Sequence, residues 1–183
     1  MINEVKRIIK ETNLQHIAFI MDGNGRWAKK RGLSRHFGHK AGCERIYEII
    51  IHLRDLEVPY FSLYAFSTEN WNRPKSELKF LFTYLKTFFK RHIKDLIRDE
   101  IRVVVSGDYT KLPQDTVMVI DDAITATKHL SKFCFNICLN YGGKQELVRA
   151  SKLIAIAYKN NELNLDELDI NTFNNYYNIA IIM

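Results

Sequence analysis

The sequence predicts an α/β fold in which a mostly parallel central sheet is flanked by helices. Short runs of β-branched and aromatic residues alternate with longer segments of helical apolar periodicity, a pattern typical of a parallel sheet covered by helices. Turn residues stand where the short runs end. The 183 residues, 46% apolar and 26% charged, fit one globular domain, which we expect to span residues 1–183.

Four short runs have the composition of strands, and six longer segments have that of helices. In open α/β sheets ligands bind outside the carboxyl ends of the strands, so the loops that follow the strands are where a functional site is expected. The predicted strands are His16–Met21, Tyr60–Phe66, Ile101–Ser106 and Phe133–Asn140. The predicted helices are Arg26–Arg31, Lys40–Leu56, Glu77–Asp99, Pro113–Leu130, Lys144–Asn160 and Leu165–Tyr177.

Composition and charge restrict the classes of protein. The apolar runs are far shorter than the roughly 20 residues that span a bilayer, and the N-terminus lacks the apolar core of a signal peptide, so we expect a cytoplasmic protein. Cys43, Cys134 and Cys138 form no CxxC pair, which favours buried thiols over disulfides or a zinc site. The net charge of +6 favours an anionic partner, either nucleic acid, a membrane surface or a phosphorylated small molecule.

The loop after the first predicted strand, Met21–Trp27, has the outline of an anion site. Its two glycines let backbone N–H groups approach a phosphate, and Arg26 can donate a bidentate pair of hydrogen bonds. Asp22 would repel a diphosphate unless a hard cation such as Mg²⁺ bridges the two. A solvated Asp-Gly turn is the alternative interpretation. Further cations follow within one or two helical turns, and each alone is typical of a surface position: Arg31, Arg35, His39 and Lys40.

The loop after the second predicted strand, within Tyr64–Pro74, carries hydroxyl, carboxylate, amide, indole and guanidinium groups. Because neighbouring strands end at the same edge of a sheet, this group can lie within reach of Asp22. Trp71 offers an apolar wall and Arg73 a second cation, which suits a substrate with one apolar and one charged end. A loop that only caps the following helix is the competing account.

Together the two loops resemble the signature regions of the cis-prenyltransferase family, to which undecaprenyl diphosphate synthase belongs. The resemblance lies in His16–Lys30, Gly38–Gly42 and Tyr64–Pro74, with further similar segments at Val105–Asp108 and Asn140–Gly143, and it runs from about residue 14 to about residue 155. It implies a Mg²⁺-dependent isoprenyl transferase that condenses isopentenyl diphosphate with an allylic diphosphate such as farnesyl diphosphate. The products of the family are polyprenyl diphosphates that serve as lipid carriers of cell-wall sugars.

The resemblance also implies roles for particular residues. Asp22 would hold Mg²⁺ and assist departure of the allylic diphosphate, and Asn70 occupies the position of the proton acceptor, although a neutral amide is a poor base. The family is typically a homodimer, and contact with a membrane surface through the lipid product is also expected, whereas nucleic acid is not an expected partner. Substrate binding would involve Gly23, Asn24, Gly25, Arg26, Trp27, Arg35, His39, Ser67, Thr68, Glu69, Trp71 and Arg73.

The sequence departs from the family pattern at its end. An Arg-x-x-Gly-Glu-x-Arg-x-Ser motif that binds isopentenyl diphosphate, and a metal-ligating Glu beyond it, do not occur. We therefore expect a C-terminally truncated member, in which Ile179–Met183 is either the start of a strand or an altered tail. Two functions stay open, namely chain elongation and an incomplete fragment or subunit that binds allylic diphosphate without turnover.

The predicted helix Glu77–Asp99 carries apolar residues at helical spacing that suit the wall of a tunnel for the growing product. The same spacing is typical of an ordinary hydrophobic core, and the sequence does not decide between these interpretations. The residues are Leu78, Leu81, Phe82, Leu85, Phe88 and Phe89.

Overall fold

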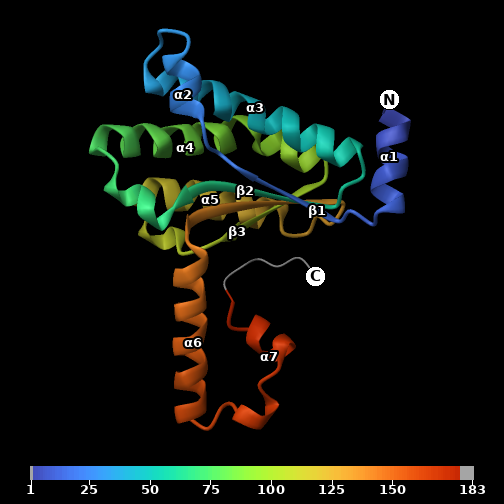
Figure 1. The fold of residues 1–183 in the computed structure, drawn as a ribbon, viewed down its shortest axis with the longest axis vertical. Coiled ribbons are helices and arrows are strands. Elements are labelled where there is room, and N and C mark those ends of the chain that lie inside the picture. Colours follow the sequence, from blue (N-terminus) through green and yellow to red (C-terminus); the bar gives the residue numbers. More distant parts are fainter. Residues whose placement is uncertain (1, 178–183) are drawn as a thin grey trace.

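A computed structural model describes residues 2–177 and contains a parallel sheet of four strands in the order β1-β2-β4-β3 (Figure 1). The predicted α/β class is therefore confirmed. The predicted strands are confirmed to within one residue at either end. Their bounds are His16–Ile20 for β1, Tyr60–Ser67 for β2, Ile101–Ser106 for β3 and Phe133–Tyr141 for β4. The segment Ile179–Met183 lies outside the described residues.

The helices follow the predicted order, with one addition and two corrections. The helix predicted to begin at Lys40 begins at Arg35, so Arg35 and His39 lie within it. The additional helix is α1, Ile2–Glu11, and the others are α2 (Asn24–Lys29), α3 (Arg35–Asp55), α4 (Lys75–Arg98), α5 (Gln114–Thr127), α6 (Gly143–Lys159) and α7 (Ile170–Asn174). Three short 3-10 helices span Thr68–Asn72, Tyr109–Lys111 and Leu165–Glu167.

The predicted continuous helix Leu165–Tyr177 is wrong, because two polar side chains start two separate turns there. Asn164 Oδ1 accepts a hydrogen bond from the backbone N–H of Asp166 at 3.2 Å and starts the 3-10 helix. Asp169 Oδ1 accepts one from Thr172 N–H at 2.7 Å and starts α7. Such side chains offer the backbone an alternative to helical hydrogen bonds, so the segment divides in two.

The hydrophobic core lies on one face of the sheet, beneath α3, α4 and α5. The strands contribute alternate residues to it, such as Phe61 and Leu63 from β2 and Phe135 and Ile137 from β4, all at most 2% exposed. Helix α6 instead extends away from the sheet, and α7 lies beside it (Figure 1). A hydrogen bond of 2.6 Å from Arg149 Nη2 to the carbonyl oxygen of Tyr176 joins these two segments.

A hydrogen-bonded row of polar side chains crosses all four strands on the opposite face of the sheet. His16 Nε2 lies 2.8 Å from Ser62 Oγ, Asn136 Nδ2 donates to Ser62 Oγ at 3.0 Å, and Ser106 Oγ donates to Asn136 Oδ1 at 3.0 Å. Ser62 and Asn136 are each only 3% exposed. Because buried polar groups need partners, the row fixes the register of the sheet.

The cysteines are free thiols, as the sequence predicted. Cys134 and Cys138 are buried and Cys43 is half-buried. Burial raises the pKa of the Cys43 and Cys134 thiols to about 11 and that of Cys138 to about 12, because a thiolate is poorly solvated there. Among residues 2–177, no helix combines the length and hydropathy that a bilayer-crossing segment requires.

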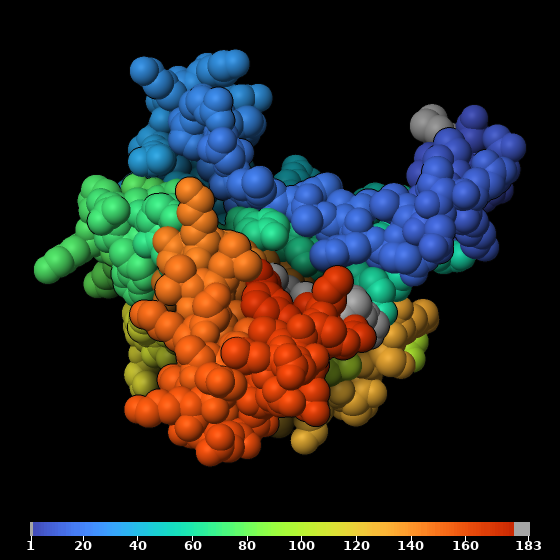
Figure 2. Space-filling model, turned by 60° about the horizontal axis from the view of Figure 1, so that its bottom comes forward, coloured from blue at the N-terminus to red at the C-terminus, as the bar shows by residue number. Residues whose placement is uncertain are grey.

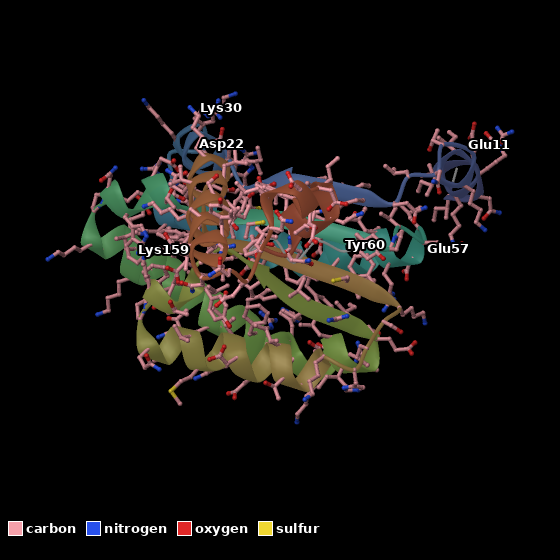
Figure 3. All side chains as sticks on the ribbon, turned by 90° about the horizontal axis from the view of Figure 1, so that it is seen from below. Glu11, Asp22, Lys30, Glu57, Tyr60 and Lys159 are labelled. Carbon is pink, nitrogen blue, oxygen red and sulfur yellow. The ribbon has the colours of Figure 1, made fainter. Side chains whose placement is uncertain are left out.

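The space-filling view shows how the parts outside the sheet are placed. Two separate projections, α1 and the α2 region, stand at opposite ends of β1, and α6 with the segments that follow it comes forward from the sheet (Figure 2). Asp22 lies at the carboxyl end of the sheet, close to Lys30, whereas Tyr60 and Glu57 lie at the opposite end (Figure 3). The loops that carry the predicted site residues therefore share one edge.

Candidate active site

A pocket of about 240 Å³ opens where β1 and β2 end. The two strand ends meet there through a hydrogen bond of 3.3 Å from Met21 N–H to the Tyr64 carbonyl oxygen. The pocket brings together six of the predicted site residues, from both loops and from the start of α3. They are Asp22, Asn24, His39, Ser67, Asn70 and Arg73. An adjoining depression is lined by Asp22, Gly23, Gly25, Arg26 and Arg35.

The first loop turns sharply at Gly23, whose φ of +88° lies in the left-handed region that glycine adopts without strain. Its backbone N–H donates to Asp22 Oδ1 at 2.6 Å. Asp22 Oδ2 pairs with Arg26 Nη2 at 2.9 Å, and both side chains are about three-quarters exposed. An ion pair this exposed contributes little to stability, so both groups are available to a ligand.

Close packing of α2 on α3 holds this loop in place. A methyl group on Gly38 would lie 2.0 Å from the carbonyl oxygen of Asn24, and one on Gly42 would lie 2.7 Å from Asn24 Oδ1. Only glycine allows the two helices to approach so closely. The first loop therefore sits directly against the turn of α3 that carries Arg35 and His39.

The second loop forms the 3-10 helix Thr68–Asn72, which is capped by its own side chains. Ser67 N–H donates to Asn70 Oδ1 at 3.1 Å, and the Ser67 hydroxyl accepts from the backbone N–H of Asn70, so the two residues form a capping box. The amide oxygen of Asn70 thus already holds a proton donor. This arrangement suits a residue that orients the loop better than one that removes a proton.

A buried carboxylate, Glu77, gathers three of the basic side chains. Glu77 Oε1 accepts from Arg73 Nη1 at 2.9 Å and lies 3.4 Å from His39 Nε2, while Glu77 Oε2 accepts from Arg35 Nη1 at 3.2 Å. The Glu77 side chain is 7% exposed. Burial lowers the pKa of His39, with Arg73 and Arg35 adding to this effect and Glu77 opposing it. Sequence reasoning missed Glu77, because only the fold brings α3 and α4 together.

The two tryptophans do not line this pocket. Trp71 Nε1 donates to Asn140 Oδ1 at 2.7 Å, and its ring packs on Phe66 and Phe82. Trp27 is 39% exposed beneath the guanidinium group of Arg31, which lies 4.2 Å from the ring centroid. The expected apolar wall is therefore not supplied by either indole in this structure.

Thr68 and Glu69 also lie away from the pocket lining. Thr68 Oγ1 is buried without a hydrogen-bond partner among the described residues. Glu69 is exposed, and its pKa is lowered by hydrogen bonds from its own backbone and from Ser67. Two tyrosines that the sequence did not single out, Tyr64 and Tyr141, do line the pocket, with ring centroids 5.8 Å apart.

The polar pocket continues into an apolar cavity of about 60 Å³ between α3, α4 and the sheet. The pocket and the cavity share five lining residues, Cys43, Ile46, Ala65, Phe66 and Leu81. Four of the six apolar residues predicted on α4 line the cavity, which are Leu81, Phe82, Leu85 and Phe88. The other two, Leu78 and Phe89, pack in the core. All six residues belong to the hydrophobic core or pack against it, so the core interpretation is confirmed, and a role of the cavity-lining residues in a product tunnel stays a prediction.

The oxygen donors fit a magnesium ion that is shared with a substrate. Within residues 2–177 no three His, Cys, Asp or Glu side chains are grouped as metal ligands. Mg²⁺ is often held by one or two carboxylates together with substrate phosphates and water. Asp22 offers one exposed carboxylate beside the depression where Arg26 and Arg35 could receive a diphosphate. This donor set suits Mg²⁺ only when the diphosphate is present.

Comparison with known proteins gives consistent matches. Residues 20–181 match the family described as "Putative undecaprenyl diphosphate synthase". An isoprenyl transferase of Bacillus subtilis is 40% identical over 169 residues, which cover 92% of this chain and 65% of the relative. The Micrococcus luteus ditrans,polycis-undecaprenyl-diphosphate synthase, described as specific for (2E,6E)-farnesyl diphosphate, is 40% identical over 93% of this chain and 71% of its own length. A Prochlorococcus marinus isoprenyl transferase is 39% identical, and 64% of it is covered.

Solved structures agree with the sequence matches. Lavandulyl diphosphate synthase from Lavandula x intermedia, in complex with dimethylallyl diphosphate, superposes with a TM-score of 0.86 at 29% identity, covering 90% of this chain and 70% of the other. A probable undecaprenyl diphosphate synthase from Campylobacter jejuni gives 0.70 at 26% identity, covering 91% and 70%. The chain thus spans about two thirds of the length of these relatives.

Proposed function

The chain belongs to the undecaprenyl diphosphate synthase family of isoprenyl transferases, and from that premise we propose that it takes part in cis-prenyl chain elongation. The reaction would condense isopentenyl diphosphate with an allylic diphosphate such as farnesyl diphosphate. One observation carries the proposal: a pocket lined by Asp22, His39 and Arg73 runs directly into an apolar cavity lined by Leu81 and Leu85. That change from a charged to an apolar lining suits a molecule with a diphosphate head and a prenyl tail.

The chemistry requires the carbon–oxygen bond of the allylic diphosphate to break, so negative charge develops on the departing diphosphate. Arg26, Arg35 and Arg73 line the pocket and the adjoining depression, where that charge would develop, and positive charges placed there in advance lower the barrier. Mg²⁺, when bound with Asp22, would supply further neutralisation of that charge. Gly23, Asn24 and Gly25 would form the backbone part of the diphosphate site beside these cations.

The double bond of isopentenyl diphosphate would then bond to the allylic carbon, and a proton would leave the condensed product. The amide oxygen of Asn70 already accepts from Ser67 N–H, and a neutral amide is a poor base. We therefore assign Asn70 to orientation of the second loop and the proton to an oxygen of the diphosphate. Ser67, Thr68, Glu69, Trp27 and Trp71 would contribute to substrate binding chiefly by shaping the loops around the pocket.

Family membership extends the proposal to the setting of the reaction. We propose that residues 1–183 form a single domain of a cytoplasmic, magnesium-dependent enzyme that makes a polyprenyl lipid carrier for cell-wall synthesis. A homodimer and surface contact with a membrane through the lipid product belong to the same proposal. The support for these features is the family resemblance.

The test is incorporation of radiolabelled isopentenyl diphosphate into lipid, with farnesyl diphosphate as primer and Mg²⁺ present. Circular dichroism first establishes that the purified chain and Asp22→Ala are equally folded. We expect incorporation by the wild-type chain and its loss both in Asp22→Ala and after chelation of the metal. A folded wild-type chain that binds farnesyl diphosphate but incorporates nothing would contradict elongation and leave an allylic binding site alone.

A further inference from the structure

Glu77 stands at the junction of the polar pocket and the two helices that frame it. It lies in the first turn of α4 and reaches two residues of the first turns of α3, Arg35 and His39, as well as Arg73 in the preceding loop. We infer that Glu77 is a positioning residue that holds Arg35 and Arg73, beside His39, in the arrangement that receives a diphosphate. The inference rests on the proposed function, because the side chains that Glu77 orders are those of the proposed diphosphate site.

The buried carboxylate of Glu77 needs its two arginine partners, and the arginines need the carboxylate to stay at the pocket. A glutamate is almost never fully buried unless it is paired, and Glu77 is 7% exposed with two guanidinium groups at hydrogen-bonding distance. The side chains of Arg35 and Arg73 are 58% and 28% exposed. Without Glu77 these two side chains have solvent to turn into. Glu77 is thus the group that keeps both of them at the pocket before a ligand arrives.

The arginines keep donors for a ligand while they are held. A guanidinium group has five N–H donors in a rigid fork, and each arginine is engaged with Glu77 through Nη1. The remaining N–H groups of Arg73, which lines the pocket, and of Arg35, which lines the adjoining depression, are free to meet phosphate oxygens within the part of the chain that the structure describes. Holding and binding are therefore compatible on the same side chain.

The charge of Glu77 also has an opposing effect, since a carboxylate near the pocket repels an anion. Without Glu77, Arg35 and Arg73 would become ordered only when the ligand binds, and ordering two long side chains at that point costs about tenfold or more in affinity. We expect the cost of ordering to exceed the gain from removing the repulsion, because Arg35 and Arg73, at 3.2 Å and 2.9 Å, already neutralise the charge of Glu77. Loss of the carboxylate should therefore weaken diphosphate binding.

Two variants separate positioning from simple charge. Glu77→Gln keeps the shape and removes the charge, whereas Glu77→Asp keeps the charge but is one methylene too short to reach both arginines. Positioning predicts that both variants bind inorganic diphosphate and farnesyl diphosphate about tenfold more weakly, as measured by titration calorimetry with Mg²⁺. A purely electrostatic role predicts tighter binding by Glu77→Gln and unchanged binding by Glu77→Asp, and this result would overturn the inference.

Two controls separate positioning from stability. Farnesol, which has the tail but no diphosphate, should bind both Glu77 variants as it binds the wild-type chain. Asp99→Asn removes a carboxylate that joins the same two helices at their other ends, where Asp99 pairs with Arg54 at 3.0 Å, and it should lower the melting temperature without weakening diphosphate binding. Equal weakening of farnesol and farnesyl diphosphate would reduce Glu77 to a structural residue and refute positioning.

The same titrations keep the inference apart from the proposed function. If the wild-type chain binds neither farnesyl diphosphate nor inorganic diphosphate, the proposed site is wrong. If the wild-type chain binds both and the two Glu77 variants bind them equally well, the site stands and the positioning role of Glu77 is refuted.

Discussion

Replacing Gly38 by alanine tests whether the close contact between α2 and α3 sets the geometry of the active site. The new methyl group would lie 2.0 Å from the carbonyl oxygen of Asn24, whereas real contacts of this kind are essentially never below 3.0 Å. The first loop, with Asp22 beside it, must therefore move by about 1 Å, and a misplacement of that size can cost a reaction about a hundredfold in rate. Because the obstacle is backbone and not a flexible side chain, relaxation is costly.

The expected change in stability follows from two opposing contributions. Overpacking of a buried contact costs about 1–3 kcal/mol, and exchange of glycine for alanine within a helix returns up to about 1 kcal/mol. We therefore expect Gly38→Ala to be destabilised by up to about 3 kcal/mol in urea unfolding. Its rate of isopentenyl diphosphate incorporation should fall about a hundredfold. Gly143→Ala is the matched control, since a methyl group there has nothing within 4 Å. Unchanged activity of Gly38→Ala would refute this reasoning.

Two further predictions concern buried polar groups. Trp71→Phe removes the hydrogen-bond donor to Asn140, which is 7% exposed, and should lower the free energy of unfolding in urea by about 1–3 kcal/mol. Trp27→Phe, at an exposed ring, should change it by no more than about 0.5 kcal/mol. Equal effects of the two substitutions would contradict the structural role of Trp71. The pKa of His39 in the folded chain lies below its ordinary value of 6.5 because the imidazole is buried. On acidification the unfolded chain therefore binds this proton at a higher pH than the folded chain does. The free energy of unfolding should fall as the pH drops below about 6.5. His39→Gln should show a shallower fall in urea titrations between pH 7 and pH 5, and an unchanged slope would mean that His39 is not the group responsible.

The sequence predicted the strands well because their signal is local. Runs of β-branched and aromatic residues such as Ile101–Ser106 favour the strand conformation through their own side chains. The segment Leu165–Tyr177 failed for an equally local reason, since Asp169 caps a new helix within it. Helix α1 was not predicted, because its short, heavily charged sequence was considered only as a candidate signal segment.

The candidate site was predictable as far as its loops and no further. Asp22, Asn70 and Arg73 meet at one edge because β1 and β2 are neighbours, an arrangement that the sequence allowed but did not determine. The direction in which Trp71 points depends instead on Asn140, 69 residues away. Glu77 looked like an ordinary first-turn glutamate, and only the packing of α4 beside α3 shows that it is buried among cations.

The orientation of a prenyl diphosphate follows from the same order of polarity on both helices. Along α4 the row of residues four apart begins with Glu77 and continues with Leu81 and Leu85, and along α3 His39 is followed by Cys43 and Ile46. Both helices begin at the carboxyl edge of the sheet, so their charged first turns lie together and their apolar turns lie together deeper in the fold. A diphosphate is stable only at the mouth and a prenyl tail only beyond it. Under the proposed function such a ligand would enter tail first, and because each condensation adds its unit at the diphosphate end, the lengthening tail would advance into the apolar part of the fold.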